Sequence, residues 1–138
     1  MRIGEAAAAT LIVGRGDSAR ALSLSSHDEF PEVFATSRMI ALMEVAAARV
    51  MKGLLKPGQL SVGVGVSVRH VAATPLDVEV RASATFLGVA GGRYRFKVQA
   101  FDPGGLIGEG EHTRAIVDTA RLLEGARDRA GALEKTLA

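Results

Sequence analysis

The stretch "FPEVFATSRMIALMEVAAARVM", residues 30 to 51, has the spacing of an amphipathic helix. Successive helical residues turn by about 100°, so its cationic side chains Arg38, Arg49, Lys52 and Lys56 fall on one face. Apolar side chains fall on the opposite face: Ile40, Met43, Ala47 and Leu54. Thr36 stands where a capping residue is expected, and "KPG" (56 to 58) is a stop signal. We therefore expect a helix from about Thr36 to Leu55.

Downstream of this helix the apolar period changes from helical to two, which is typical of strands. In "LSVGVGVSVRHVAAT" (60 to 74), the even-numbered valines from Val62 to Val68 are expected on one face. Further strands are predicted over 77–86, 94–101 and 106–117, with turns at "GVAGGR" and "DPGG". An earlier strand is predicted at "AAAATLIV" and a short helix over 119–137.

The predicted order is one strand, a long helix, four strands joined by hairpins, and a short helix. Strands clustered after a helix predict an α+β fold, with the helix laid across one face of an antiparallel sheet. The 138 residues fit a single domain spanning 1–138. A sheet this narrow is expected to cover its edges, and dimerisation is a common way to do so.

Composition excludes several classes of function. The chain has no cysteine, which excludes disulfides and a thiol nucleophile. Its net charge is only +2 and no cluster of Lys and Arg is interleaved with aromatic residues, so we predict no nucleic-acid partner. No apolar run reaches the roughly 18 residues of a membrane span, and we predict a cytoplasmic protein with no membrane contact.

Glu44 is a carboxylate at the edge of the apolar stripe of the helix. It is either a boundary residue that reaches water or a partly desolvated group for acid–base or nucleophilic work. Thr36 either caps the helix or presents its hydroxyl beside the first helical amides. His70 follows the row of valines and is either a half-buried structural histidine or a catalytic one. His112 is expected to be solvent-exposed, and with no HExxH or similar spacing we predict no metal site.

Three segments together are more specific than any one of them: "EFPEVFATSRMIALMEVA" (29 to 46), "SVGVGVSVRHVAATP" (61 to 75) and "GEGEHTRAIV" (108 to 117). In that order they resemble the fluoroacetyl-CoA thioesterase family of hot-dog proteins, over residues 29 to 118. The resemblance implies a long helix wrapped by an antiparallel sheet. It also implies a homodimer with active sites at the interface and an acyl-CoA substrate, with no cofactor beyond the coenzyme A of that substrate.

The same resemblance implies roles for individual residues. The catalytic threonine, glutamate and histidine of the family match Thr36, Glu44 and His70. Three substrate-binding residues of the family match Phe30, which would line the acyl pocket, Gly63 and Arg114. Where the family has a second pocket phenylalanine, this sequence has His27. Thioester hydrolysis is thus implied more strongly than selectivity for fluoroacetyl-CoA, and Phe30 favours a short acyl chain.

Three other interpretations remain open at this point. A non-catalytic module that binds acyl-CoA or another small ligand would have the same fold. A hot-dog enoyl-CoA hydratase is less consistent with the sequence, because no neighbouring Asp and His pair occurs in one loop–helix segment. A purely structural dimer would leave the joint presence of Thr36, Glu44 and His70 unexplained.

Overall fold

The computed structural model describes residues 1–137, with the side chains of residues 1–131. Five strands form its sheet: β1 (Ala6–Ile12), β2 (Gln59–His70), β3 (Glu79–Ala90), β4 (Arg93–Asp102) and β5 (Gly105–Asp118). The long helix is α1 (Thr36–Met51), and α2 (Thr119–Leu137) ends the described chain. Three short 3-10 turns complete it: η1 (Arg15–Asp17), η2 (Ala19–Leu22) and η3 (Lys52–Leu54). The α+β architecture predicted from the sequence is confirmed.

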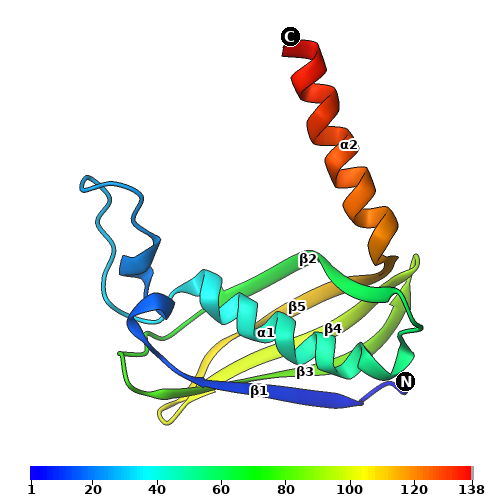
Figure 1. Cartoon of the computed structure of the whole chain (residues 1–138). Coiled ribbons are helices and arrows are strands. Elements are labelled where there is room, and N and C mark those ends of the chain that lie inside the picture. The colour runs from blue at the N-terminus through cyan, green and yellow to red at the C-terminus, as the bar shows by residue number, and fades with distance from the viewer. Residues whose placement is uncertain (138) are drawn as a thin grey trace.

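The sheet is antiparallel with strand order β1-β3-β4-β5-β2, and α1 lies across its concave face (Figure 1). Only β3–β4 and β4–β5 are hairpins between neighbours in sequence. The prediction that hairpins join all four later strands is wrong for β2 and β3. The connection 71–78 instead carries the chain across the sheet, so that β2 pairs with β5 and becomes an edge strand.

The core lies between α1 and the central strands. Helical spacing places six buried side chains of α1 against the sheet: Met39, Leu42, Met43, Ala46, Ala47 and Met51. The period of two in β3 and β4 is confirmed, because Val80, Ala82, Ala84, Phe86, Phe96, Val98 and Ala100 are all buried. Burial of such side chains contributes roughly 1.5–3 kcal/mol for each of the larger ones, which is enough to fix α1 on the sheet.

A β-bulge interrupts β2, and the prediction of one unbroken valine face is wrong for this reason. The pairing with β5 shifts register between Gly63 and Gly65, leaving Val64 as an extra residue. One additional residue exchanges the two faces of a strand with period two. Ser61 and Gly63 therefore face α1 before the bulge, and Val66, Val68 and His70 face it afterwards, as their cross-strand partners require.

Helix α2 continues from β5 and projects away from the body of the fold (Figure 1). Its predicted range is confirmed. None of the helices in the described part of the chain is both long and apolar enough to cross a membrane.

Candidate active site

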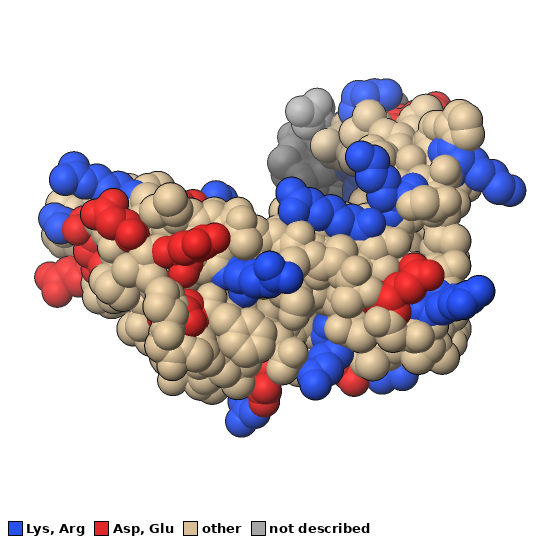
Figure 2. All heavy atoms as spheres, turned by 90° about the horizontal axis from the view of Figure 1, so that it is seen from below, with Lys and Arg blue, Asp and Glu red and all other residues tan. Residues whose placement is uncertain are grey.

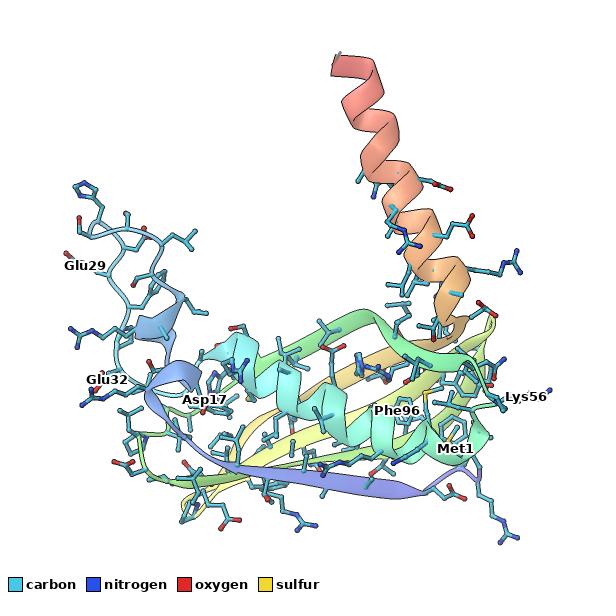
Figure 3. The ribbon with its side chains drawn as sticks, in the orientation of Figure 1. Met1, Asp17, Glu29, Glu32, Lys56 and Phe96 are labelled. Atoms are coloured by element: carbon cyan, nitrogen blue, oxygen red, sulfur yellow. The ribbon has the colours of Figure 1, made fainter. Side chains whose placement is uncertain are left out.

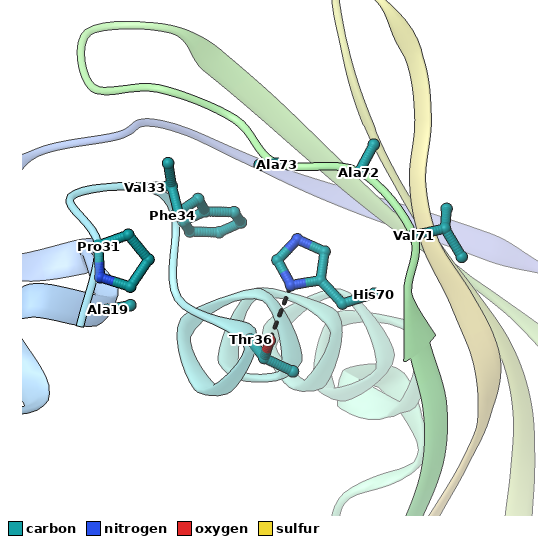
Figure 4. Close-up of a pocket in the computed structure, with 9 residues that line it drawn as sticks. All are labelled: Ala19, Pro31, Val33, Phe34, Thr36, His70, Val71, Ala72 and Ala73. Atoms are coloured by element: carbon teal, nitrogen blue, oxygen red, sulfur yellow. Dashed lines mark hydrogen bonds between the residues drawn. The ribbon is translucent and has the colours of Figure 1, made fainter. Parts of the chain in front are cut away.

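Thr36 and His70 meet at the start of α1. The Thr36 hydroxyl lies 2.8 Å from Nδ1 of His70, the last residue of β2 (Figure 4). The capping interpretation of Thr36 is wrong: Ala35 occupies the N-cap position, and Thr36 is the first helical residue with its side chain turned to His70. Because α1 begins at Thr36, the hydroxyl lies beside the positive end of the helix dipole.

A pocket of about 360 Å³ opens beside this pair. Its walls are otherwise mostly apolar: Ala19, Pro31, Val33, Phe34, Val71, Ala72 and Ala73 (Figure 4). Burial lowers the pKa of His70 below its ordinary 6.5, against a smaller raising effect of the Ala72 backbone. His70 is therefore neutral near pH 7. Its Nδ1 can then accept a hydrogen bond from the Thr36 hydroxyl, which makes the pair chemically competent for proton transfer.

The pocket wall is held by Thr74, which is fully buried. Its hydroxyl donates to Asp102 Oδ2 at 2.7 Å, and its carbonyl accepts from the amide of Phe34 at 2.8 Å. The second bond ties the segment after His70 to the segment before Thr36, and the first anchors Thr74 at the end of β4. Thr74 thus connects the two parts of the chain that carry the hydrogen-bonded pair.

Glu44 lies two turns along α1, with 43% of its side chain exposed at the boundary that the sequence predicted. Its Oε1 accepts from Arg114 Nη1 at 3.2 Å. Gly63 packs so closely beneath it that a Cβ at Gly63 would collide with Oε1. Glu44 lines a second pocket of about 290 Å³ together with Ile40, Gly63, Val64, Gly65, Val66 and His112.

Arg114 is buried, with 7% of its side chain exposed, and all three of its nitrogens have partners. Nε donates to the Ser61 hydroxyl at 3.0 Å and Nη2 to the Ser61 carbonyl at 2.9 Å. Nη1 donates hydrogen bonds to Glu44 Oε1 and to His112 Nε2. Burial lowers the pKa of Arg114 and the neighbouring Glu44 opposes this. Arg114 remains a cation, because a guanidinium keeps its proton in proteins, and its hydrogen bond to Glu44 orients that carboxylate.

His112 is the residue of this site that sequence reasoning missed, because it was expected to be solvated. It is buried at 3% exposure. Its Nδ1 donates to the Gly65 carbonyl at 2.7 Å, so Nε2 is left to accept from Arg114 Nη1 at 3.1 Å. The available signal was its parity, since His112 and Arg114 stand two residues apart on one strand and share a face.

The candidate residues thus form two groups in one protomer. The first group is Thr36 with His70; the second is Glu44 with Gly63 and Arg114. Eight residues of continuous helix separate Thr36 from Glu44, about 12 Å along the axis, which excludes a direct bond. Phe30 lies apart from both groups, 46% exposed and lining a separate hollow in the segment before α1. No group of three or more metal-ligating side chains occurs in the described residues.

Comparison with known proteins decides the family. The sequence profile of the family described as "Fluoroacetyl-CoA-specific thioesterase" matches residues 13–120. The chain belongs to this family. It is 40% identical over 119 residues to a fluoroacetyl-CoA thioesterase of Streptantibioticus cattleyicolor, a match that covers 85% of this chain and 86% of that protein.

Solved structures agree with this assignment. The fluoroacetyl-CoA thioesterase FlK superposes with a TM-score of 0.87 at 38% identity, covering 93% of this chain and 96% of that one. A hot-dog-like protein of Thermanaerovibrio acidaminovorans superposes with a TM-score of 0.79 at 25% identity, covering 92% and 91%. The hot-dog fold expected from the sequence is confirmed. As a member of the family, this chain is a thioester hydrolase with an acyl-CoA substrate.

Proposed function

We propose that this family member hydrolyses a small acyl-CoA to the free acid and coenzyme A, using Thr36, Glu44 and His70 and no metal. The observation that carries the proposal is the state of Glu44, a half-exposed carboxylate fixed by the buried Arg114 above a glycine that gives it room. Hydrolysis of a thioester needs an activated nucleophile, stabilisation of the oxyanion and a proton for the departing thiolate. These residues supply all three.

In this proposal Glu44 either attacks the thioester carbonyl carbon or removes a proton from the water that attacks it. The Thr36 hydroxyl and the first amides of α1 polarise the carbonyl oxygen as negative charge develops there. The C–S bond then breaks and the thiolate of coenzyme A takes up a proton, for which His70 is the relay. When Glu44 is the nucleophile, water hydrolyses the resulting anhydride and restores the carboxylate.

The same residues argue for a homodimer. Because Thr36 and Glu44 are held two turns apart on a continuous helix, one protomer cannot bring both to a single carbonyl. Strand β2 carries Gly63 beside Glu44 and His70 beside Thr36, and its outer edge is unpaired. A second copy paired along that edge in the opposite direction would bring its Thr36 and His70 toward Glu44, Gly63 and Arg114. We propose two such composite sites for each dimer.

The acyl group is proposed to be short, either acetyl or a substituted acetyl. The relative from Streptantibioticus cattleyicolor carries fluoroacetyl-CoA in its name, and Phe30 has the size to close a small acyl pocket. His27 is exposed at the position of the second pocket phenylalanine of the family, so a different acyl preference is consistent with this chain. The proposed location of the enzyme is cytoplasmic.

The test is thiol release from a series of acyl-CoA esters, from acetyl and fluoroacetyl to longer and aromatic groups, with the Glu44→Gln variant measured beside the wild type. We expect one or more short esters to be cleaved and the variant to lose about 10²–10⁴-fold in kcat with little change in KM. Glu111→Gln, on the outer face of the sheet, is the matched control. Binding of acyl-CoA without turnover by the wild type would refute hydrolysis and favour the binding module.

A further inference from the structure

Two projecting arms flank the unpaired edge of β2. One arm is segment 20–32, which lies beyond the His70 end of the strand, and the other is α2, which rises beside its Gln59 end (Figure 1). Between them the edge carries exposed apolar side chains, among them Leu60, Val64 and Val66. An apolar edge strand with free hydrogen-bonding groups is a template for pairing with another chain.

Helix α2 carries an apolar stripe that the described part of its own protomer covers only in part. Leu122 is 44% exposed and Leu123 51% exposed. At about 100° per residue, Ala126 and Ala130 continue the same stripe. Among residues 119–131, whose side chains the structure describes, the two charged residues nearest to the stripe are Arg127 and Arg129, which are both cationic and lie on either side. The other charged residues within 119–131 face away from the stripe: Arg121, Glu124 and Asp128.

Segment 20–32 has the complementary character. It exposes Leu24 almost completely, at 96%, and Phe30 at 46%. Around them stand the acidic side chains Asp28, Glu29 and Glu32, and Arg20 offsets only one of these through its 3.7 Å ion pair with Glu32. Figure 3 shows Glu29 and Glu32 on the arm opposite α2. Figure 2 shows acidic side chains together with some basic ones at that end, and mainly basic ones on the helix.

The two arms cannot meet within one chain, because β2 separates them along its length (Figure 1). An antiparallel pairing of β2 with a second copy reverses the strand, so the Gln59 end of one protomer lies beside the His70 end of the other. We propose that α2 of each protomer packs its apolar stripe on segment 20–32 of the partner, with Arg127 and Arg129 facing Glu29 and Glu32. The inference rests on the homodimer of the proposed function.

This contact gives α2 a role in the acyl pocket. Phe30 belongs to segment 20–32, and the helix from the second copy fixes the position of that segment. The profile of the family ends at residue 120, so nearly all of α2 lies outside the matched region. Acyl-group preference in this enzyme thus depends partly on a helix that the family match does not include.

A disulfide between protomers tests the contact directly, because the natural chain has no cysteine. In the double variant Ser26→Cys with Ala126→Cys, one cysteine lies on each arm. Under mild oxidation we expect a covalent dimer in a denaturing gel without reductant. The matched control is Ser26→Cys with Glu124→Cys, which moves the second cysteine to the opposite face of α2. Each single-cysteine variant controls for collisional crosslinking.

Light scattering of the wild type separates this inference from the homodimer on which it rests. A dimer that forms no crosslink above the controls would overturn the α2 contact and leave the dimer in place. A monomer would overturn both, while thiol release would still report on hydrolysis. Charge reversal gives an independent readout. Arg127→Glu with Arg129→Glu is expected to weaken dimerisation by at least about tenfold, and Glu29→Lys with Glu32→Lys to restore it in the combined variant.

Arg121→Glu reverses one charge, half the change of the double variant, on the face of α2 that points away from the stripe. It is expected to leave dimerisation unchanged. Equal weakening by Arg121→Glu, or no restoration in the combined variant, would mean that the effect is one of net charge rather than of the proposed contact.

Discussion

Thr36 and His70 are 34 residues apart in the sequence and share a hydrogen bond of 2.8 Å, which joins the first residue of α1 to the last residue of β2. The bond exists because α1 begins one residue earlier than side-chain capping by Thr36 would require, which leaves its hydroxyl free for the histidine. A threonine hydroxyl that does not cap its helix and is instead hydrogen-bonded to a histidine is available for chemistry.

Replacing Thr36 by Val separates chemistry from folding. The substitution keeps the shape and removes the hydroxyl, and since no capping bond is lost we expect a stability cost of only about 0.5–1.5 kcal/mol. We expect kcat to fall about 10²-fold or more, and Thr36→Ser to recover much of that loss. Steady-state kinetics and urea unfolding of the three proteins measure both quantities. Unchanged kcat in Thr36→Val would remove Thr36 from the mechanism.

The pH dependence of activity follows from burial of His70. Its pKa lies below 6.5, so the neutral form that accepts from Thr36 persists into mildly acidic solution. We expect kcat/KM to be flat around pH 7 and to fall only below pH 6.5, as His70 becomes protonated. A pH–rate profile between pH 5 and 8 measures this limb. A limb well above pH 6.5 would contradict the assignment of His70 as the neutral partner.

Stability should vary with pH through His112. Burial lowers its pKa below 6.5, with the Gly65 carbonyl opposing that shift. Below pH 6.5 the unfolded chain therefore binds a proton that native His112 does not, and the free energy of unfolding falls as pH decreases. Above pH 6.5 both states are neutral and this loss disappears. We expect urea unfolding at pH 5.5 and 7.5 to show a smaller difference in His112→Gln than in the wild type; an unchanged difference would exclude His112 as a source.

Much of the fold could be predicted, because in α1 and β3 the pattern of apolar residues along the sequence matches the face that is buried. The spacing of Met43 and Ala47 on α1 and the alternation from Val80 to Phe86 each result from burial of one face, and the structure confirms both. The bulge at Val64 could not be predicted, because it depends on register with β5 rather than on residues of β2 itself. The edge position of β2 depended likewise on pairing between distant strands.

Some residues of the candidate site could likewise be placed from the sequence, and others could not. The sequence placed Glu44 correctly at the border between the apolar and polar faces of α1, because helical periodicity alone decides that position. It misplaced His112, because whether a polar residue within a strand is buried depends on partners from elsewhere, here Gly65 and Arg114. The separation of Thr36 and Glu44 did follow from the helical rise, and it is the reason for expecting shared sites.

Complementation between inactive variants tests shared sites. In a mixed dimer of Glu44→Gln with His70→Asn, a composite site takes its glutamate from one protomer and its histidine from the other. One of the two sites then has both residues intact. After random exchange of protomers we expect about one quarter of wild-type activity, since about half of the dimers are mixed. If each site used one chain only, every site would lack a residue and mixing would restore nothing.

Gly63 gives the sharpest test of the geometry around Glu44. A Cβ there would collide with Oε1 of Glu44 and lie 3.1 Å from Cε1 of His112, although the backbone of Gly63 itself accepts an L-residue. We expect Gly63→Ala to fold, to displace the carboxylate from Arg114, and to lower kcat more than it raises KM. Gly53→Ala is the matched control, because nothing lies within 4 Å of a Cβ at that position. Equal activity of the two variants would show that the position of Glu44 beside Arg114 does not matter for turnover.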